Sequence, residues 1–109
     1  MSLFWTLDEN HNPVPTDDAA VWHEYRRKHK RVAFTQLPDC WVSTTFLGMD
    51  HGWSGDPPIL FETMAFKGQY SDGTVNDLDY TDRYATWDEA VAGHAATVEK
   101  IRASEPQSG

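Results

Sequence analysis

Residues 41–66, WVSTTFLGMDHGWSGDPPILFETMAF, constrain the fold more than any other part of the chain. Residues 41–48 and 59–66 are rich in β-branched and aromatic side chains, which favour a pleated, half-buried surface. The segment between them, 48–58, carries glycine, proline, aspartate and histidine, which end strands or tolerate unusual backbone angles. This pattern predicts two strands at the centre of a small sheet, joined by a loop.

The sequence before this region predicts a strand, a helix and a second strand. Residues 3–7 alternate loosely and form a short strand, and the prolines of 13–15 give an extended connector. Thr16 or Asp17 is expected to cap a helix that runs to about residue 28. Residues 31–37 alternate as a half-buried strand that pairs with the strand at residue 41 in an antiparallel hairpin.

The sequence after residue 66 predicts an irregular stretch and a second helix. Residues 67–82 are polar and form either an exposed excursion or a functional flap, and residues 83–84 add an edge strand. Thr86 and Glu89 have the spacing of a capping box, which opens a helix. The inward face of this helix is expected to carry Trp87, Val91, His94, Val98 and Ile101.

The element order β-α-β-β-β-(β)-α predicts a single α+β domain over residues 1–109, with a frayed tail at 104–109. Three to five antiparallel strands form the sheet, and both helices cover one of its faces. Because the strands carry large apolar side chains on both sides, the second face is expected to meet another subunit or a ligand. A homodimer is the favoured arrangement.

Composition narrows the range of partners. No apolar run approaches the ~18 residues of a membrane span, and no secretion signal is visible, so we expect a cytoplasmic protein without a membrane partner. The net charge of −8 makes nucleic acid an unfavourable partner, since most of the surface repels phosphates. The cations of RRKHKR, residues 26–31, either complement the carbonyl end of the first helix or bind phosphate.

Glu62 is the central residue of the predicted site. It lies among apolar residues of a strand, and a half-buried carboxylate needs a partner or takes up a proton. Arg83 and His94 are the expected partners. The alternative is that Glu62 forms a buried structural pair with one of them and has no catalytic or binding role, because structural pairs shift pKa values as readily as catalytic pairs do.

The loop at 48–58 supplies the other candidates. Trp53, between glycines, is expected either to stack on a ligand or to fold back over the core, and His51 follows the strand end. No HxH, HExxH or Cys/His metal-ligand spacing is present, so we predict no metal site. We assign no cofactor and no catalytic residue. The predicted ligand-binding set is His51, Trp53, Glu62, Arg83, Tyr84 and His94.

The segments WVSTTFLGMDH, PPILFETMAF and RYATWDEAVAGH, with LDE at 7–9 and PVP at 13–15, resemble a family of small uncharacterised proteins from phage and prophage genomes. The resemblance extends from residue 7 to about residue 102, and Thr45, Met49 and Ala85 depart mildly from the pattern. It implies a phage-type origin and a single compact domain, and it transfers no catalytic residue. By analogy, small acidic phage proteins often antagonise host defences.

Three functions therefore stand as hypotheses. The first is a counter-defence protein of the host cytosol that binds, rather than transforms, a small polar or nucleotide-like ligand. The second is an inhibitor of a host protein that mimics nucleic acid. The third is a small hydrolase working by acid/base or metal chemistry. The inhibitor would use Asp72, Asp77, Asp79 and Asp82, and the hydrolase Asp50, His51, Glu62 and His94.

Overall fold

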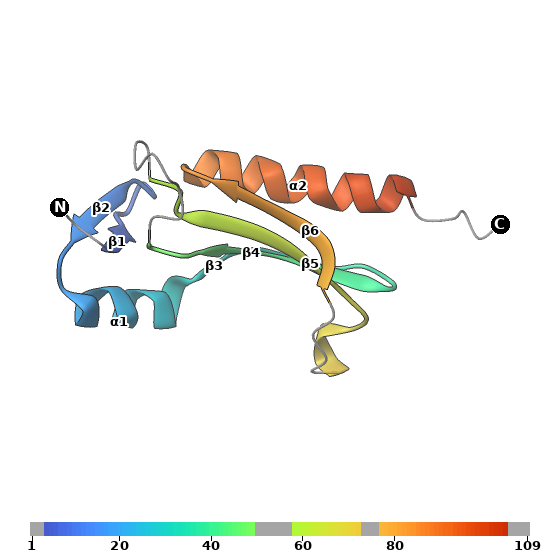
Figure 1. Ribbon diagram of the computed structural model, residues 1–109, viewed down its shortest axis with the longest axis horizontal. Coiled ribbons are helices and arrows are strands. Elements are labelled where there is room, and N and C mark those ends of the chain that lie inside the picture. Colours follow the sequence, from blue (N-terminus) through green and yellow to red (C-terminus); the bar gives the residue numbers. More distant parts are fainter. Residues whose placement is uncertain (1–3, 50–57, 73–76, 105–109) are drawn as a thin grey trace.

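The computed structural model describes residues 4–49, 58–72 and 77–104, and it confirms an α+β fold. Two helices accompany a two-stranded and a four-stranded antiparallel sheet (Figure 1). Neither helix combines the length and apolar character needed to cross a membrane. The elements are β1 (Phe4–Leu7), β2 (Pro13–Thr16), α1 (Ala19–His29), β3 (Arg31–Gln36), β4 (Cys40–Phe46), β5 (Phe61–Lys67), the 3-10 turn η1 (Tyr70–Asp72), β6 (Asp77–Tyr84) and α2 (Trp87–Ser104).

The four-stranded sheet has the order β3-β4-β5-β6, with every neighbouring pair antiparallel. The two strands predicted at its centre are β4 and β5, and the hairpin of β3 with β4 is also confirmed. Thr44 lies opposite Thr63 and Phe46 opposite Phe61. The loop predicted at 48–58 lies mostly outside the described residues, as does the predicted tail beyond Ser104.

Residues 13–16, predicted as an extended connector, form strand β2 and pair with β1. Both prolines are tolerated because β1 is the only described neighbour of β2, so one side of the strand needs no backbone donor. Asp8 closes the hairpin turn by accepting from the backbone N–H groups of Asn10 and Asn12 at 2.8 and 2.9 Å. The Trp5 backbone N–H donates to the Gly48 carbonyl at 2.8 Å, which joins the hairpin to the end of β4.

Helix α2 covers one face of the four-stranded sheet (Figure 1). The predicted capping box is present, since Glu89 N–H donates to Thr86 Oγ1 at 3.1 Å and Thr86 N–H donates to Glu89 Oε1 at 3.2 Å. The predicted inward face is wrong at Val91, which is 44% exposed. The helix is rotated slightly, because the side chains buried against the sheet are those of Ala90, His94, Thr97, Val98 and Ile101.

The expectation that both helices share one sheet face holds for α2 only. Helix α1 lies at the end of the sheet where the β1–β2 hairpin packs, and its Tyr25 ring meets Phe46 edge-on at 5.7 Å (Figure 1). It has no fully buried residue, because Trp22 and Tyr25 are its only large half-buried apolar side chains and cannot cover a sheet. Trp22 Nε1 donates to the Leu47 carbonyl at 3.2 Å. The helix is capped by Asp18, not by Thr16 or Asp17.

The irregular stretch predicted at 67–82 is wrong for its second part, which belongs to β6. Strand β6 pairs only with β5 in the described part of the chain, so it is an edge strand. An edge strand presents little surface to the core and carries polar residues readily, which hides the period-two pattern of a half-buried strand. The sequence of residues 77–82 therefore resembles that of a loop, although its backbone forms a strand.

Substitution of Gly93 tests the packing of α2 on the sheet. A Cβ at this position would overlap the Tyr84 ring, which lies against the helix backbone. Gly93→Ala gains about 1 kcal/mol of helix propensity, but displacing the ring costs about 1–3 kcal/mol. We expect a net loss in the free energy of unfolding, measured by urea denaturation. Ala96→Ser on the exposed side is the control, and a raised urea midpoint for Gly93→Ala would contradict the packing.

Candidate functional site

The predicted partnership of Glu62 with Arg83 is confirmed. The two residues lie opposite each other on β5 and β6, and Arg83 Nε donates to Glu62 Oε2 at 3.0 Å. The side chain of Glu62 is 16% exposed and that of Arg83 is 49% exposed. Because Phe61 and Thr63 are buried on the α2 side of β5, the alternation of the strand places Glu62 on the opposite face. We call this opposite face the open face.

His94 lies on the other side of the sheet and does not pair with Glu62. The side chain is 6% exposed, with Nε2 2.9 Å from Thr35 Oγ1 and Nδ1 2.7 Å from Thr44 Oγ1. Thr44 is in turn hydrogen-bonded to Thr63. Three neighbouring strands thus contribute one hydroxyl each to a polar network beneath α2, which we call the His94 network.

The predicted ligand-binding set is therefore divided. Glu62 and Arg83 belong to the open face, whereas His94 and Tyr84 pack between the sheet and α2. His51 and Trp53 lie outside the described residues. The division follows from strand alternation, since residues that are one apart on β6 point to opposite faces.

The His94 network joins α2 to the sheet through hydrogen bonds. Burial lowers the pKa of His94, which favours the neutral ring. A neutral imidazole has one donor and one acceptor nitrogen, and a threonine hydroxyl can take either role. The hydrolase hypothesis places Glu62 and His94 in one site, but the sheet separates them. Within the described ranges, no three His, Cys, Asp or Glu residues are grouped to hold a metal ion.

The open face carries four aromatic side chains in mutual contact, which we call the aromatic cluster: Phe34, Trp41, Phe66 and Tyr70. Trp41 stacks on Phe66 with ring centroids 4.2 Å apart. Tyr70 meets both Trp41 and Phe34 edge-on at 5.1 Å. The inner members are shielded, whereas Tyr70 is 50% exposed.

Arg31 and the turn η1 complete this surface. The Arg31 guanidinium carbon lies 4.7 Å from the Phe34 ring centroid and 5.3 Å from that of Tyr70. Tyr70 is held in position within the turn η1, because the Tyr70 backbone N–H donates to Gln36 Oε1 at 2.9 Å. Gln69 Nε2 donates to the Pro38 carbonyl at 2.6 Å. An aromatic side chain and a guanidinium are thus presented together by a fixed backbone.

The sequence pattern did not place Phe34, Trp41 or Tyr70 in a site, and it indicated Arg31 only as part of the RRKHKR run. The alternation of β3 and β4 does indicate part of the aromatic cluster. Phe34 lies opposite Ser43 and Gln36 lies opposite Trp41, so these four side chains share one face of the sheet. Tyr70 carries no such signal. It reaches the cluster only because the chain after β5 folds back under the sheet (Figure 1).

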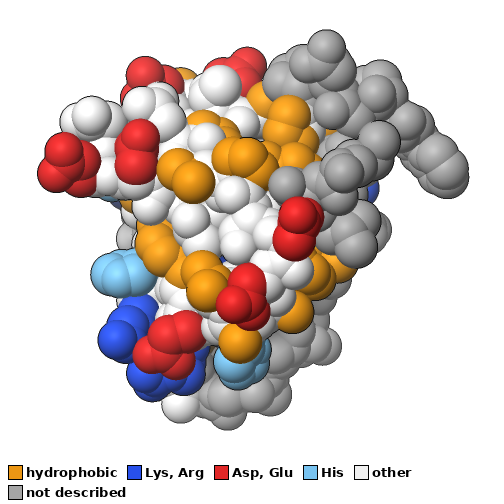
Figure 2. Space-filling model, turned by 90° about the vertical axis from the view of Figure 1, so that its left-hand side faces the viewer, with side chains coloured by type: hydrophobic (Ala, Val, Ile, Leu, Met, Phe, Trp, Pro, Cys, Tyr) orange, Lys and Arg blue, Asp and Glu red, His pale blue; other side chains and the backbone are white. Residues whose placement is uncertain are grey.

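A groove of about 520 Å³ lies between α1 and β1. Ala20, Val21 and Tyr25 line it, and its two charged lining residues, Glu24 and Lys28, pair with each other at 3.2 Å. The groove therefore has no net charge with which to select a charged ligand. Figure 2 shows the end of the molecule that carries the β1–β2 hairpin and α1, where scattered hydrophobic side chains lie above a group of Lys, Arg and His side chains at the level of α1.

Comparisons with protein-family models, with curated proteins and with solved structures found no match. The resemblance to a phage family therefore stays a prediction.

The pH dependence of stability tests the His94 network. Burial lowers the pKa of His94 in the folded chain below the unfolded value of about 6.5. The stability that the neutral, buried ring contributes is therefore fully present above about pH 6.5 and is lost as the pH falls below that value. We expect the free energy of unfolding to decrease from pH 7 to pH 5, with a shallower slope for His94→Gln. The lowered carboxyl pKa values of Asp8 and Glu24 act only below their ordinary values of 3.8 and 4.5. Equal slopes for His94→Gln, the wild type and the exposed control Ala95→Ser would contradict this assignment.

Proposed function

We propose that this is a binding protein without catalytic activity that takes a nucleotide-like ligand on the aromatic cluster of the open face. The observation that carries the proposal is the half-exposed Tyr70 ring, held by η1 with the Arg31 guanidinium over it. Stacking of a base on an aromatic side chain contributes about 1–3 kcal/mol. A guanidinium beside the ring adds attraction for the anionic part of such a ligand.

The charges of the open face favour an anion at one end. Arg83 is paired with Glu62, so that pair contributes little net field. Arg31 makes its ring contacts without a carboxylate partner among the described residues. An anionic group therefore has an uncompensated cation beside Tyr70, and a base has an aromatic surface that pays little conformational entropy on binding.

The biological role we attach to this activity is counter-defence in the host cytosol. Its support is the resemblance of the sequence to phage and prophage proteins. A protein that sequesters a signalling nucleotide needs only a binding surface. The alternative occupant of the same face is a second copy of the chain, as in the predicted homodimer.

Calorimetric titration with adenosine and a panel of mono- and dinucleotides tests the proposal. We expect saturable binding that weakens about tenfold, or by about 1.4 kcal/mol, in Tyr70→Ala. Tyr70→Phe keeps the ring and should retain affinity. Arg31→Gln should weaken nucleotides more than adenosine, whereas its matched control Arg102→Gln on the exposed side of α2 should change neither.

Two outcomes of this experiment oppose the proposal. Absence of heat for every ligand would remove it, as would equal losses in Arg31→Gln and Arg102→Gln. Solution mass measured in parallel distinguishes a ligand from a second copy of the chain on the open face. A wild-type dimer that dissociates in Tyr70→Ala would show that the open face is a subunit contact.

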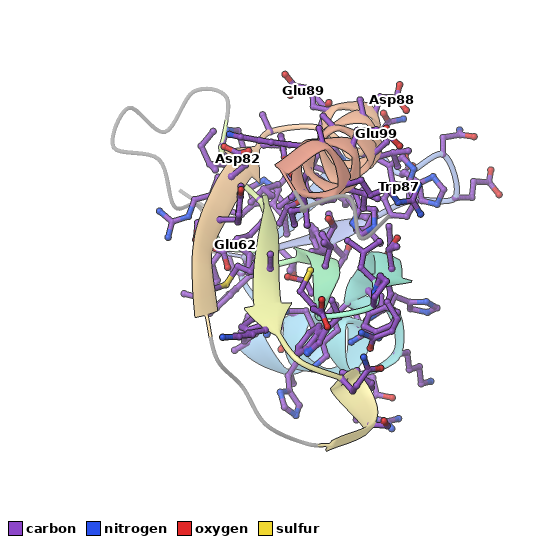
Figure 3. All side chains as sticks on the ribbon, turned by 90° about the vertical axis from the view of Figure 1, so that its right-hand side faces the viewer. Glu62, Asp82, Trp87, Asp88, Glu89 and Glu99 are labelled. Carbon is purple, nitrogen blue, oxygen red and sulfur yellow. The ribbon has the colours of Figure 1, made fainter. Side chains whose placement is uncertain are left out.

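A second candidate function is the acidic inhibitor of a host protein. Figure 3 shows Glu89, Asp88 and Glu99 along α2 and Asp82 on the neighbouring β6. Asp82 and Asp88 are exposed and form no ion pair with a described residue. Of the four aspartates predicted for this role, only Asp82 has a described side chain.

This candidate predicts salt-sensitive binding to a basic protein surface, because exposed charges are screened within about 8 Å at physiological ionic strength. Binding of a defined DNA-binding host protein at low salt should weaken in the double variant Asp82→Asn, Asp88→Asn. Unchanged affinity in this variant, with no dependence on salt, would exclude these acids as the contact surface.

A further inference from the structure

A concave region of about 270 Å³ is lined entirely by basic side chains and a histidine: His23, Arg26, Arg27 and Lys30. We call it the basic pocket. It lies on α1 and the residue that follows it, and Figure 2 shows Lys, Arg and His side chains grouped at this level of the molecule. The chain has a net charge of −8, yet five of its nine Lys and Arg residues fall within residues 26–31. The pocket is thus a local reversal of the overall charge.

Arg26 is held in one position within the basic pocket. Its Nε donates to the Phe46 carbonyl at 3.1 Å, and its guanidinium carbon lies 5.3 Å from the Trp22 ring centroid. No described residue accepts a hydrogen bond from its two Nη groups or pairs with its charge. A fixed guanidinium with free donors is preorganised for an anion, since little side-chain entropy is lost on binding.

The positive charge of the pocket exceeds what the structure itself neutralises. Arg27 bonds to Glu24 at 2.9 Å and Lys28 approaches the same carboxylate at 3.2 Å. These two contacts, with Arg27 the stronger, lower the pKa of Glu24 to about 2. Within the described part of the chain, Arg26 and Lys30 have no such partner.

Compensation of the α1 dipole does not account for this excess. The carbonyl end of a helix is equivalent to about half a negative charge. One cation would balance it, and the Lys30 backbone N–H already satisfies the Arg26 carbonyl at 3.1 Å. Two cations without a carboxylate partner, beside the paired Arg27, leave the pocket positive.

We propose that the basic pocket binds the phosphate group of a small ligand. Guanidinium groups match phosphate oxygens in a two-pronged geometry, and a lysine ammonium adds a point charge. A polynucleotide suits the molecule less well, because its remaining phosphates would meet a surface that carries the bulk of the −8 charge. The proposal does not depend on the aromatic cluster, which is made of other residues.

Titration with inorganic phosphate and pyrophosphate at constant ionic strength tests the pocket, with amide chemical shifts of α1 as the measurement. Neither anion has a base to stack on the aromatic cluster, and the α1 amides report binding at the basic pocket, whereas adenosine has no phosphate and probes the aromatic cluster. Arg31→Gln should therefore leave the α1 shifts unchanged. We expect pyrophosphate to bind more tightly than phosphate. Its dissociation constant should rise about tenfold in Lys30→Gln or Arg27→Gln, the loss expected for one hydrogen bond to a charged group.

Lys100→Gln and Arg102→Gln on α2 are the matched controls and should bind as the wild type does. Arg26→Gln is less suitable because it also removes the bond to the Phe46 carbonyl. Absence of saturable shifts with either anion, or equal weakening in the α2 controls, would overturn the proposal. Tighter binding of a single-stranded oligonucleotide than of pyrophosphate at the same ionic strength would overturn the assignment to a small ligand.

Discussion

The His94 network is the buried polar contact that joins α2 to the sheet. A buried imidazole must have partners for both nitrogens, because an unsatisfied buried polar group costs about 1–3 kcal/mol. Thr35 and Thr44 supply those partners, and Thr63 is bonded to Thr44. The network thereby fixes the rotation of the helix and determines which sheet face is covered.

Covering one face leaves the aromatic cluster on the other, where η1 folds back on it and α1 lies at the far end of the sheet (Figure 1). The sheet also separates the titratable groups, with Glu62 and Arg83 on the open face and His94 beneath α2. Groups on opposite faces of a sheet cannot share a proton or a substrate atom. The same geometry that separates Glu62 from His94 gathers aromatic and cationic side chains on the open face.

Parts of the candidate site were predictable and parts were not. The Glu62–Arg83 pair follows from a half-buried carboxylate that needs a cation, which is a local requirement. The choice between Arg83 and His94 as its partner was open, because a sequence does not state which helix covers which face. Tyr70 was missed, since its role comes from a turn that returns beneath a strand that is distant in the chain. The basic pocket was visible as the RRKHKR run, but its concave shape was not.

The sequence by itself determined the α+β class, the two central strands, the β3–β4 hairpin and the capping box of α2. These features depend on side-chain alternation and on groups within a few residues of each other. Tertiary structure decided that residues 13–16 form a strand, that α1 lies apart from α2, and that residues 77–84 pair with β5. The physical reason is that an edge strand or a sparsely apolar helix gains its stability from distant neighbours, whose positions no local pattern contains.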